Sequence, residues 1–365
     1  MHPLLILFLM VGIPAFVGLM FIFVRGTPQM RRYIITRIIL TIPMVLILAT
    51  VVFFVLRIVP GDPVTSSLGP KGSPEIRERL TQELGLDKPL PQQYVAFLGD
   101  VVTLDFGNAL TSGRRPIVDE LGERLPATVE LVVPAAIVAL VLGIIPGAFA
   151  ATKRRGARDY GLRMTSVVIY AMPIFWLGLL FQLLFGVKLG WTPISGRLGA
   201  ETSTTLDRTT NIYVIDSVIS GNWAAFKSAL HHLILPVMTL GLVLSGVFLR
   251  LTRINVVETM EHDYVTAART RGVKEKTVVY RHALKNAMIP IITLIGLQVA
   301  ILLAGAVLTE SVFGWPGMGR YLVDRIRLRD YVAVQSVITM FAVFVALISL
   351  AVDILYSLID PRVRY

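Results

Sequence analysis

Few residues in this sequence have the types and spacing that chemistry would require. The chain of 365 residues contains no cysteine, so thiol catalysis, disulfides and cysteine-ligated metals are excluded. His231 and His232 are adjacent, so on a helix they point about 100° apart, and no nearby carboxylate completes a metal site. The glycines of the GWPGMG run (Gly314, Gly317 and Gly319) follow no strand and precede no Gly-Lys-Ser/Thr, which argues against a phosphate-binding loop. The sequence therefore predicts a chain without a catalytic centre, a metal or a bound cofactor of its own.

Two acidic residues fall well inside long apolar stretches. A charge at the middle of a bilayer costs roughly 3 kcal/mol, so such residues are functional candidates. Glu130 is about one helical turn past Pro126, and we expect it to reach water or a helix end near the outer surface. Asp353 lies about two turns before Asp360, and we expect it to line the inner end of a pathway or to pair with a tail arginine. Asp353 is the candidate pathway residue.

The elements that position these residues are predicted to be membrane-spanning helices. Hydrophobic residues make up 55% of the chain and charged residues 16%, and the mean hydropathy is +0.70, which is too apolar for a soluble domain. About 20 apolar residues are needed to cross a hydrocarbon core of roughly 30 Å. Seven stretches are long enough: Leu4–Val24, Ile34–Leu56, Ala127–Ala151, Met164–Val187, Leu233–Leu251, Ala287–Leu308 and Val332–Leu358. Prolines within them are expected to kink helices in a packed bundle, at Pro43, Pro134, Pro146, Pro173, Pro236 and Pro290.

The first stretch, Leu4–Val24, differs from a secretory signal peptide. A signal peptide carries its cations before the apolar run, whereas here Arg25, Arg31 and Arg32 follow it. We therefore favour an uncleaved extra span. Residues 1–30 would form this segment and its linker, and residues 31–365 a transmembrane domain with an outer loop over 59–125 and a cytoplasmic loop over 252–286.

The distribution of cations predicts the orientation of the chain. When the Arg25–Arg37 linker is placed inside, 19 of the 35 Lys and Arg residues fall on that side. The amino terminus is then outside the cell if the first span is retained, and the carboxyl terminus is cytoplasmic. The formal charge of +11 is explained by basic loops beside lipid, so we expect no nucleic acid partner.

The outer loop contains one predicted helix. Ser73 can cap it, Pro74 suits its first turn and Gly85 can end it. Its apolar stripe is Ile76, Leu80 and Leu84. This helix either packs on the outer mouth of the bundle or offers a docking surface to a partner.

The cytoplasmic loop is predicted to form two short helices that bend at Gly272 and project from the membrane. The first has apolar residues at the spacing of one helical face, namely Met260, Tyr264, Ala267 and Ala268. Gly272 suits a left-handed residue after the helix end, with Val273 contacting Ala268. The second helix runs through Val278, Tyr280, Ala283 and Leu284. Periodicity alone fits an interfacial helix lying on anionic lipid equally well.

The run TAARTRG, from Thr266 to Gly272, and the run HALKNAMIP downstream resemble the cytoplasmic signature of permease subunits of ATP-binding-cassette importers. In that family the helix before the glycine is the coupling helix, which inserts into a groove on an ATPase. The resemblance carries this role to Asp263, Tyr264, Thr266, Ala267, Ala268, Arg269 and Gly272.

Other runs agree with this resemblance and narrow it. Thr266 replaces the usual glutamate and Lys285 stands where many members have proline, and with Asp263-Tyr264 these departures resemble the dipeptide, oligopeptide and nickel subgroup. The same subgroup is resembled by RIVPGDPV (57–64), GLDKPLPQQY (85–94), RLPATVEL (124–131), ESVFGWPGMGR (310–320) and DPRVRY (360–365). The similarity covers residues 31–365.

The resemblance implies an all-α integral membrane protein of the cell membrane, with a six-span importer permease core, one extra N-terminal transmembrane helix and a cytoplasmic coupling helix. It implies import of short peptides by alternating access, with a second homologous permease, two ATP-binding-cassette ATPases that bind ATP and Mg, and an extracytoplasmic solute-binding protein. The same architecture could instead import nickel or another small solute. An ion-gradient-driven secondary transporter is the rival class, but it would need more buried charge than Asp353 supplies. A membrane-embedded enzyme would need convergent nucleophile, base or metal ligands at membrane depth, and the spans offer none.

Overall fold

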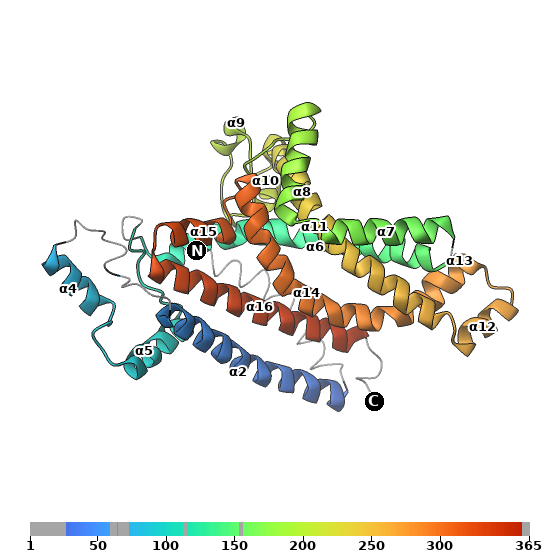
Figure 1. Ribbon diagram of the computed structural model, residues 1–365, viewed down its shortest axis with the longest axis horizontal. Helices are drawn as coiled ribbons and strands as arrows, with labels where there is room; N and C mark the ends of the chain where they lie inside the picture. The colour runs from blue at the N-terminus through green and yellow to red at the C-terminus, as the bar shows by residue number, and fades with distance from the viewer. Residues whose placement is uncertain (1–26, 59–63, 65–72, 112–114, 153–155, 360–365) are drawn as a thin grey trace.

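The computed structural model describes residues 27–58, 64, 73–111, 115–152 and 156–359 (Figure 1). The predicted first span, Leu4–Val24, and the carboxyl-terminal tail from residue 360 lie outside the described residues. The helices are α2 (Pro28–Ile58), α4 (Pro74–Glu83), α5 (Leu90–Thr103), α6 (Ile117–Thr152), α7 (Ala157–Ala171), α8 (Ile174–Phe181), α9 (Ala200–Ser203), α10 (Tyr213–Ile219), α11 (Trp223–Thr259), α12 (Asp263–Thr270), α13 (Glu275–Thr277), α14 (Leu284–Phe313), α15 (Met318–Arg327) and α16 (Tyr331–Ile359), with wider π-helical turns at η2 (Gln182–Lys188) and η3 (Val278–Ala283).

The long helices run roughly along the longest dimension of the molecule (Figure 1). The short helices α12 and α13 lie at one end, and α4, α5 and α15 lie towards the other, so the two ends of the bundle carry different structures. The segment α8 stands across the direction of the long helices, and in this view it lies on the same side of the bundle as the short helices α9 and α10.

The described residues contain four helices long and apolar enough to cross a membrane, α2, α6, α11 and α16. Two further pairs of helices reach that length together but are bent. One is α7 with α8 and η2, and the other is the helical arm from Glu275 to Phe313, which comprises α13, η3 and α14 and is bent into two halves. If each bent pair is one span, the number is six, in agreement with the predicted six-span core and the predicted all-α class.

The prolines act unevenly on these spans. The chain bends by 101° between α7 and α8 at Pro173, where the preceding Met172 is extended (φ −75°, ψ 130°), as steric contact with a proline ring requires. The kink predicted at Pro173 is therefore present as a full corner. The arm ending in α14 instead bends by 49° between Gln298 and Ala300, well past Pro290. The prolines in α2, α6 and α11 lie inside unbroken helices.

The core of the bundle is the contact between α6 and α11, which is made close by glycines. A Cβ on Gly143 would lie 2.4 Å from a Cβ of α11, and one on Gly147 would lie 2.7 Å from an α11 backbone oxygen. On the facing helix, a Cβ on Gly241 would lie 2.8 Å from an α6 backbone oxygen. Small residues at this spacing let two backbones approach in lipid, where apolar side chains gain little by leaving the hydrocarbon.

The loop over 59–125, which the sequence predicts to lie on the outer side, contains the predicted capped helix, α4. The Ser73 hydroxyl accepts a hydrogen bond from the Ile76 N–H at 3.3 Å, and Gly85 follows the helix with a φ of +61°. Leu80 is buried, but Ile76 is 48% exposed, so the predicted apolar stripe is only partly covered. The next helix, α5, packs on α2 through rings of Phe53 and Phe97 whose centroids are 5.5 Å apart.

Candidate functional site

The helix α12 begins where the chain turns at the end of α11. His262 before it is extended (φ −75°, ψ 148°), and α12 then runs from Asp263 to Thr270. The seven predicted coupling residues all lie in this helix or just after it. Those exposed are Asp263, Tyr264, Thr266, Arg269 and Gly272; Ala267 is half-buried and Ala268 is buried. The surface that α12 presents outward is therefore mainly polar.

Gly272 ends α12 as predicted. Its φ is +74°, in the left-handed region that favours glycine. The Gly272 N–H donates to the Arg269 carbonyl at 2.9 Å, and the Val273 N–H donates to the Ala268 carbonyl at 3.2 Å, which together form a Schellman cap. No heavy atom lies within 4 Å of a Cβ built on Gly272. The backbone conformation therefore restricts this position, and space does not.

Behind α12 lies an inner cluster of buried apolar residues from several elements. Its members are Ala148, Ala151, Val256, Met260, Val265, Ala268, Val278, Val279, Ala283 and Ala287. They come from α6, from α11 and its cap, from α12, from η3 and from α14. Because close-packed side chains transmit strain, a displacement of α12 would act on α6, α11 and α14 together.

The predicted apolar face of α12 is wrong in part. Tyr264 is 41% exposed, whereas Val265 is fully buried in the inner cluster. The periodicity counted Met260 and Ala267 on one helix, but Met260 caps α11 and the chain breaks before α12 starts. Residues of two separate elements were thus assigned to one face.

The predicted separate second helix is also wrong. The segments α13, η3 and α14 follow one another without a gap from Glu275 to Phe313. The side chains of Val278, Val279 and Ala283 are buried in the inner cluster, which explains the apolar pattern of that segment. The hairpin therefore consists of one short helix, α12, and a continuous helical arm that enters the membrane.

Two polar contacts hold α12 against this arm. Arg269 forms two hydrogen bonds with Glu275, Nη2 to Oε1 at 2.7 Å and Nε to Oε2 at 3.1 Å, across the Gly272 turn. The hydrogen bond to Glu275 raises the pKa of the Arg269 guanidinium. Both side chains are about half exposed, so this pair contributes about 0–1 kcal/mol. The Asn286 amide donates to the Tyr264 hydroxyl at 2.7 Å.

The predicted pathway residue Asp353 lies beside α2. Its Oδ2 is 3.5 Å from Arg37 Nε, and the Tyr33 hydroxyl lies 3.5 Å from its Oδ1. In the described part of the chain its cationic partner is thus Arg37, while the predicted tail arginines lie outside the described residues. Asp353 lines a cavity of about 540 Å³ between α2, α14 and α16.

Glu130 is held in a buried ion pair with Arg197. Its Oε2 accepts from Arg197 Nε at 2.6 Å, and its Oε1 accepts from the Val214 N–H at 2.7 Å, in the first turn of α10. The Arg197 guanidinium also lies 3.7 Å from the centre of the Tyr213 ring. The predicted contact with a helix end is therefore confirmed, but Glu130 is 5% exposed and does not reach water.

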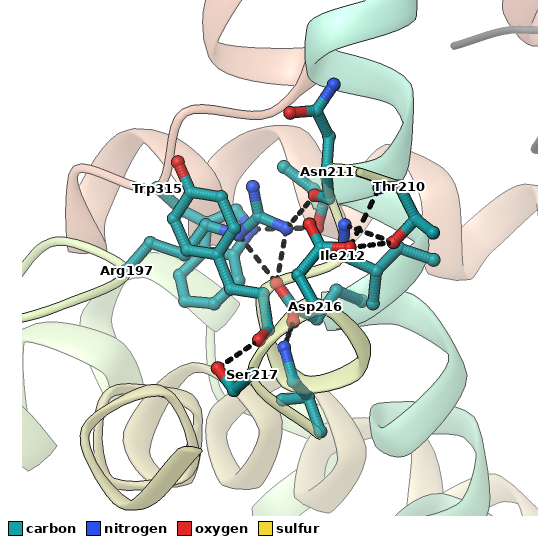
Figure 2. A network of polar contacts seen from close by, with 11 residues as sticks. Arg197, Thr210, Asn211, Ile212, Asp216, Ser217 and Trp315 are labelled. Carbon is teal, nitrogen blue, oxygen red and sulfur yellow. Dashed lines mark hydrogen bonds and ion pairs between the residues drawn. The ribbon is translucent and has the colours of Figure 1, made fainter. Parts of the chain in front are cut away.

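The same network organises the loop before α10. Figure 2 shows Arg197 between Trp315 and the segment that contains Asn211 and Asp216. The Asp216 Oδ1 accepts from the Thr210 N–H at 2.8 Å and from the Thr210 hydroxyl at 2.7 Å. A loop that the sequence left without interpretation is thus tied to α6 through one arginine.

A third acid in the spans, Glu310, was missed by sequence reasoning. The predicted span ended at Leu308, whereas α14 continues to Phe313. Glu310 is fully buried and accepts from the Thr128 hydroxyl at 2.6 Å and from the Arg320 N–H at 2.9 Å. A Cβ on Gly317 would lie 2.2 Å from Glu310 Oε1, so the GWPGMG run is a turn anchored on a carboxylate.

The histidine pair serves the backbone. His231 Nε2 lies 2.6 Å from the Trp191 carbonyl, and His232 Nδ1 lies 2.8 Å from the Ser228 carbonyl. Over the described ranges, no three His, Asp or Glu side chains are grouped as a metal site would require.

Comparison with known proteins finds similarity over most of the chain. Residues 139–365 match the family described as binding-protein-dependent transport system inner membrane component, and residues 30–132 match its N-terminal counterpart. The chain is 42% identical to the di/tripeptide transport system permease protein DppB of Pseudomonas aeruginosa, over 92% of this chain and 99% of that protein. It is 40% identical to the dipeptide transport system permease protein DppB of Escherichia coli K12, over 92% and 99%. It is 36% identical to the glutathione transport system permease protein GsiC of the same strain, over 92% and 100%.

Proposed function

Because the chain belongs to the family of binding-protein-dependent transport system inner membrane components, we propose that it is the permease subunit of an ATP-binding-cassette importer of short peptides. It is an all-α, multi-pass membrane protein, and the relatives described above are transport system permease proteins.

The substrate class follows from those relatives. The names of the three relatives above refer to dipeptides, tripeptides or glutathione, all of which are short peptides with charged groups. This favours peptides over nickel or another small solute for the present chain.

Energy is supplied by other subunits. No Gly-x-x-x-x-Gly-Lys-Ser/Thr run occurs in the sequence, which supports the assignment of ATP and Mg to two separate ATPase subunits. The working assembly also contains a second, homologous permease and an extracytoplasmic solute-binding protein. The exposed part of α4, including Ile76, offers that binding protein a docking surface on the outer side.

The observation that carries the mechanism is the position of α12 on the inner cluster. A Schellman cap and the Arg269–Glu275 pair keep α12 compact, while Val265 and Ala268 join it to the inner ends of α6, α11 and α14. An ATPase that moves α12 as it closes on ATP therefore moves these spans as one body. Rigid rotation of this kind opens the pathway alternately to the two sides.

The distribution of charge supports a cytoplasmic position for α12. Four residues that follow its cap or lie in the arm, Lys274, Lys276, Arg281 and Lys285, add positive charge to that end of the bundle. The carboxyl terminus is then cytoplasmic, and the amino terminus is outside the cell if Leu4–Val24 is retained. The membrane is the cell membrane.

Purification tests this function directly. The tagged chain should bring two P-loop ATPases with it, and Ala267→Asp should abolish both that association and peptide uptake while the chain still inserts. The reason is that Ala267 is half-buried on the outward side of α12, where a carboxylate holds a partner surface away. Thr204→Asp, which adds the same charge at an exposed outer site, is the matched control. Normal uptake by Ala267→Asp would contradict the coupling role, and a chain that purifies without ATPases would favour a secondary transporter.

A further inference from the structure

The cavity beside Asp353 has the composition of a site for a zwitterion. Its volume of about 540 Å³ falls in the range of ~300–1,000 Å³ that is usual for ligand sites. Arg37 and Asp353 line it together, so one positive and one negative group face the same space. Four hydroxyl groups, those of Tyr33, Thr41, Thr293 and Ser349, also line it. Those of Tyr33, Thr41 and Thr293 already donate within the protein, but their oxygens can still accept from a peptide N–H.

The geometry of the Arg37–Asp353 ion pair leaves both side chains able to bind a charged ligand in place of each other. Arg37 Nε and Asp353 Oδ2 are 3.5 Å apart, which is longer than a charge-assisted hydrogen bond. The side chains are 43% and 28% exposed, so the pair is weakly held and a ligand can reach both members. A free carboxylate would offer Arg37 a bidentate partner, and an ammonium group would offer Asp353 a donor.

The backbone beside the cavity is bent. The helical arm bends by 49° between Gln298 and Ala300, and Gly296, Leu297 and Ala300 of this region line the cavity. Bends of this kind within membrane spans are associated with cavities and substrate sites. The bend is an observation independent of the charges of Arg37 and Asp353, and it also indicates a substrate site at this cavity.

The cavity also lies where two spans are held together. Just inside it, Met30, Ile34 and Ile354 form a small buried cluster between α2 and α16. Arg37 is about 8 Å along α2 from Arg32, and Asp353 is about 9 Å from the end of α16, so the ion pair closes this contact near the inner surface.

We propose that this cavity binds the two charged termini of a short peptide in transit, with its carboxylate on Arg37 and its ammonium on Asp353. Since both charges of the protein are then occupied by peptide, the contact between α2 and α16 at this level is released, and the inner end of the pathway opens. The inference rests on the proposed function of peptide import, and it names where and how the permease itself meets its substrate.

The absence of cysteine from the chain allows a direct test. Thr293→Cys places a thiol in the cavity, and Thr36→Cys places a matched thiol on an exposed part of α2 outside the residues that line it. The full importer, with cysteine-free partners, is reconstituted in vesicles and labelled with a water-soluble maleimide in the presence of increasing alanylalanine. We expect alanylalanine to slow labelling at Thr293→Cys and not at Thr36→Cys.

Substitution of Asp353 and of Arg37 shows whether the cavity recognises the charged termini of the peptide. In the Asp353→Asn background, protection by alanylalanine should require about tenfold more peptide, because a hydrogen bond to a charged group is lost. Protection by N-acetyl-alanylalanine, which has no ammonium group, should require the same concentration of peptide whether or not Asp353→Asn is present. Arg37→Gln should give the corresponding result with alanylalanine amide, which has no free carboxylate.

The outcomes separate this inference from the function on which it rests. Alanylalanine uptake by the wild-type importer is measured in the same vesicles. The cavity assignment alone would be overturned if alanylalanine is taken up but does not slow labelling at Thr293→Cys. It would also be overturned if Asp353→Asn raises the protecting concentration equally for the free and the N-acetylated peptide. If the wild-type importer takes up no alanylalanine and the peptide slows labelling at neither thiol, peptide import is refuted together with the cavity assignment.

Discussion

Substitution of Gly272 tests whether the conformation of the α12 cap is what couples the permease to its ATPases. The backbone there has a φ of +74°, and a Cβ would meet no atom within 4 Å. A side chain at this position is therefore penalised by its own backbone and not by neighbours. The penalty for an L-residue in the left-handed region is roughly 1–2 kcal/mol, with β-branched residues at the upper end and asparagine below it.

This penalty is too small to unfold the bundle but large enough to open the cap. A cost of roughly 1–2 kcal/mol changes the ratio of capped to frayed α12 by a factor of about 5–30. Fraying breaks the bonds from Gly272 to Arg269 and from Val273 to Ala268, and it loosens α12 on the inner cluster. We expect peptide-stimulated ATPase activity and uptake to fall in the order Gly, Asn, Ala, Val, with valine the lowest.

The assay is peptide-stimulated ATP hydrolysis by the reconstituted importer, with insertion measured separately. Gly221→Val is the matched control, because Gly221 has a φ of +66°, open space around it and a place far from α12. It should lower stability by a similar amount and leave the coupling of ATPases intact. If the three Gly272 variants behave like the wild type, the cap is not part of the coupling. If asparagine is as harmful as valine, bulk at a partner surface matters and backbone conformation does not.

Three further predictions concern the bundle and its orientation. Arg197→Met should destabilise the folded protein by roughly 3–5 kcal/mol and lower its thermal midpoint, because Glu130 is left buried and unpaired. The double variant Arg197→Met with Glu130→Gln should recover most of this stability. Equal losses in the single and double variants would contradict the pairing. Gly147→Leu should prevent stable packing of α6 on α11, since a Cβ there lies 2.7 Å from a backbone oxygen. The control Gly161→Leu has open space around it and should remain folded. Size-exclusion chromatography after heating measures both variants. A thiol at Thr270→Cys should be labelled by an impermeant reagent only from the cytoplasmic side and one at Thr204→Cys only from outside; the reverse pattern would invert the proposed topology.

Features set by local physics could be predicted from the sequence alone. Among the described residues, hydropathy over about 20 residues located the four spanning helices and the two bent pairs that can each form one span, because hydrocarbon thickness acts on each helix separately. The Ser73 cap, a bend at Pro173 and the left-handed Gly272 were predicted correctly, since each depends on bonds within a few residues. The resemblance of ordered runs such as TAARTRG placed the chain in its family before any contact was known.

The tertiary structure alone decided which residues meet across the bundle. Tyr33 and Asp353 are 320 residues apart in the chain, and Arg197 and Glu130 are 67 apart, so no local pattern pairs them. The face of α12 was misassigned because periodicity cannot detect that the chain breaks before Asp263. Buried charges acquire partners only when several helices are packed, since the cost of burial is met by whichever groups the fold brings within reach.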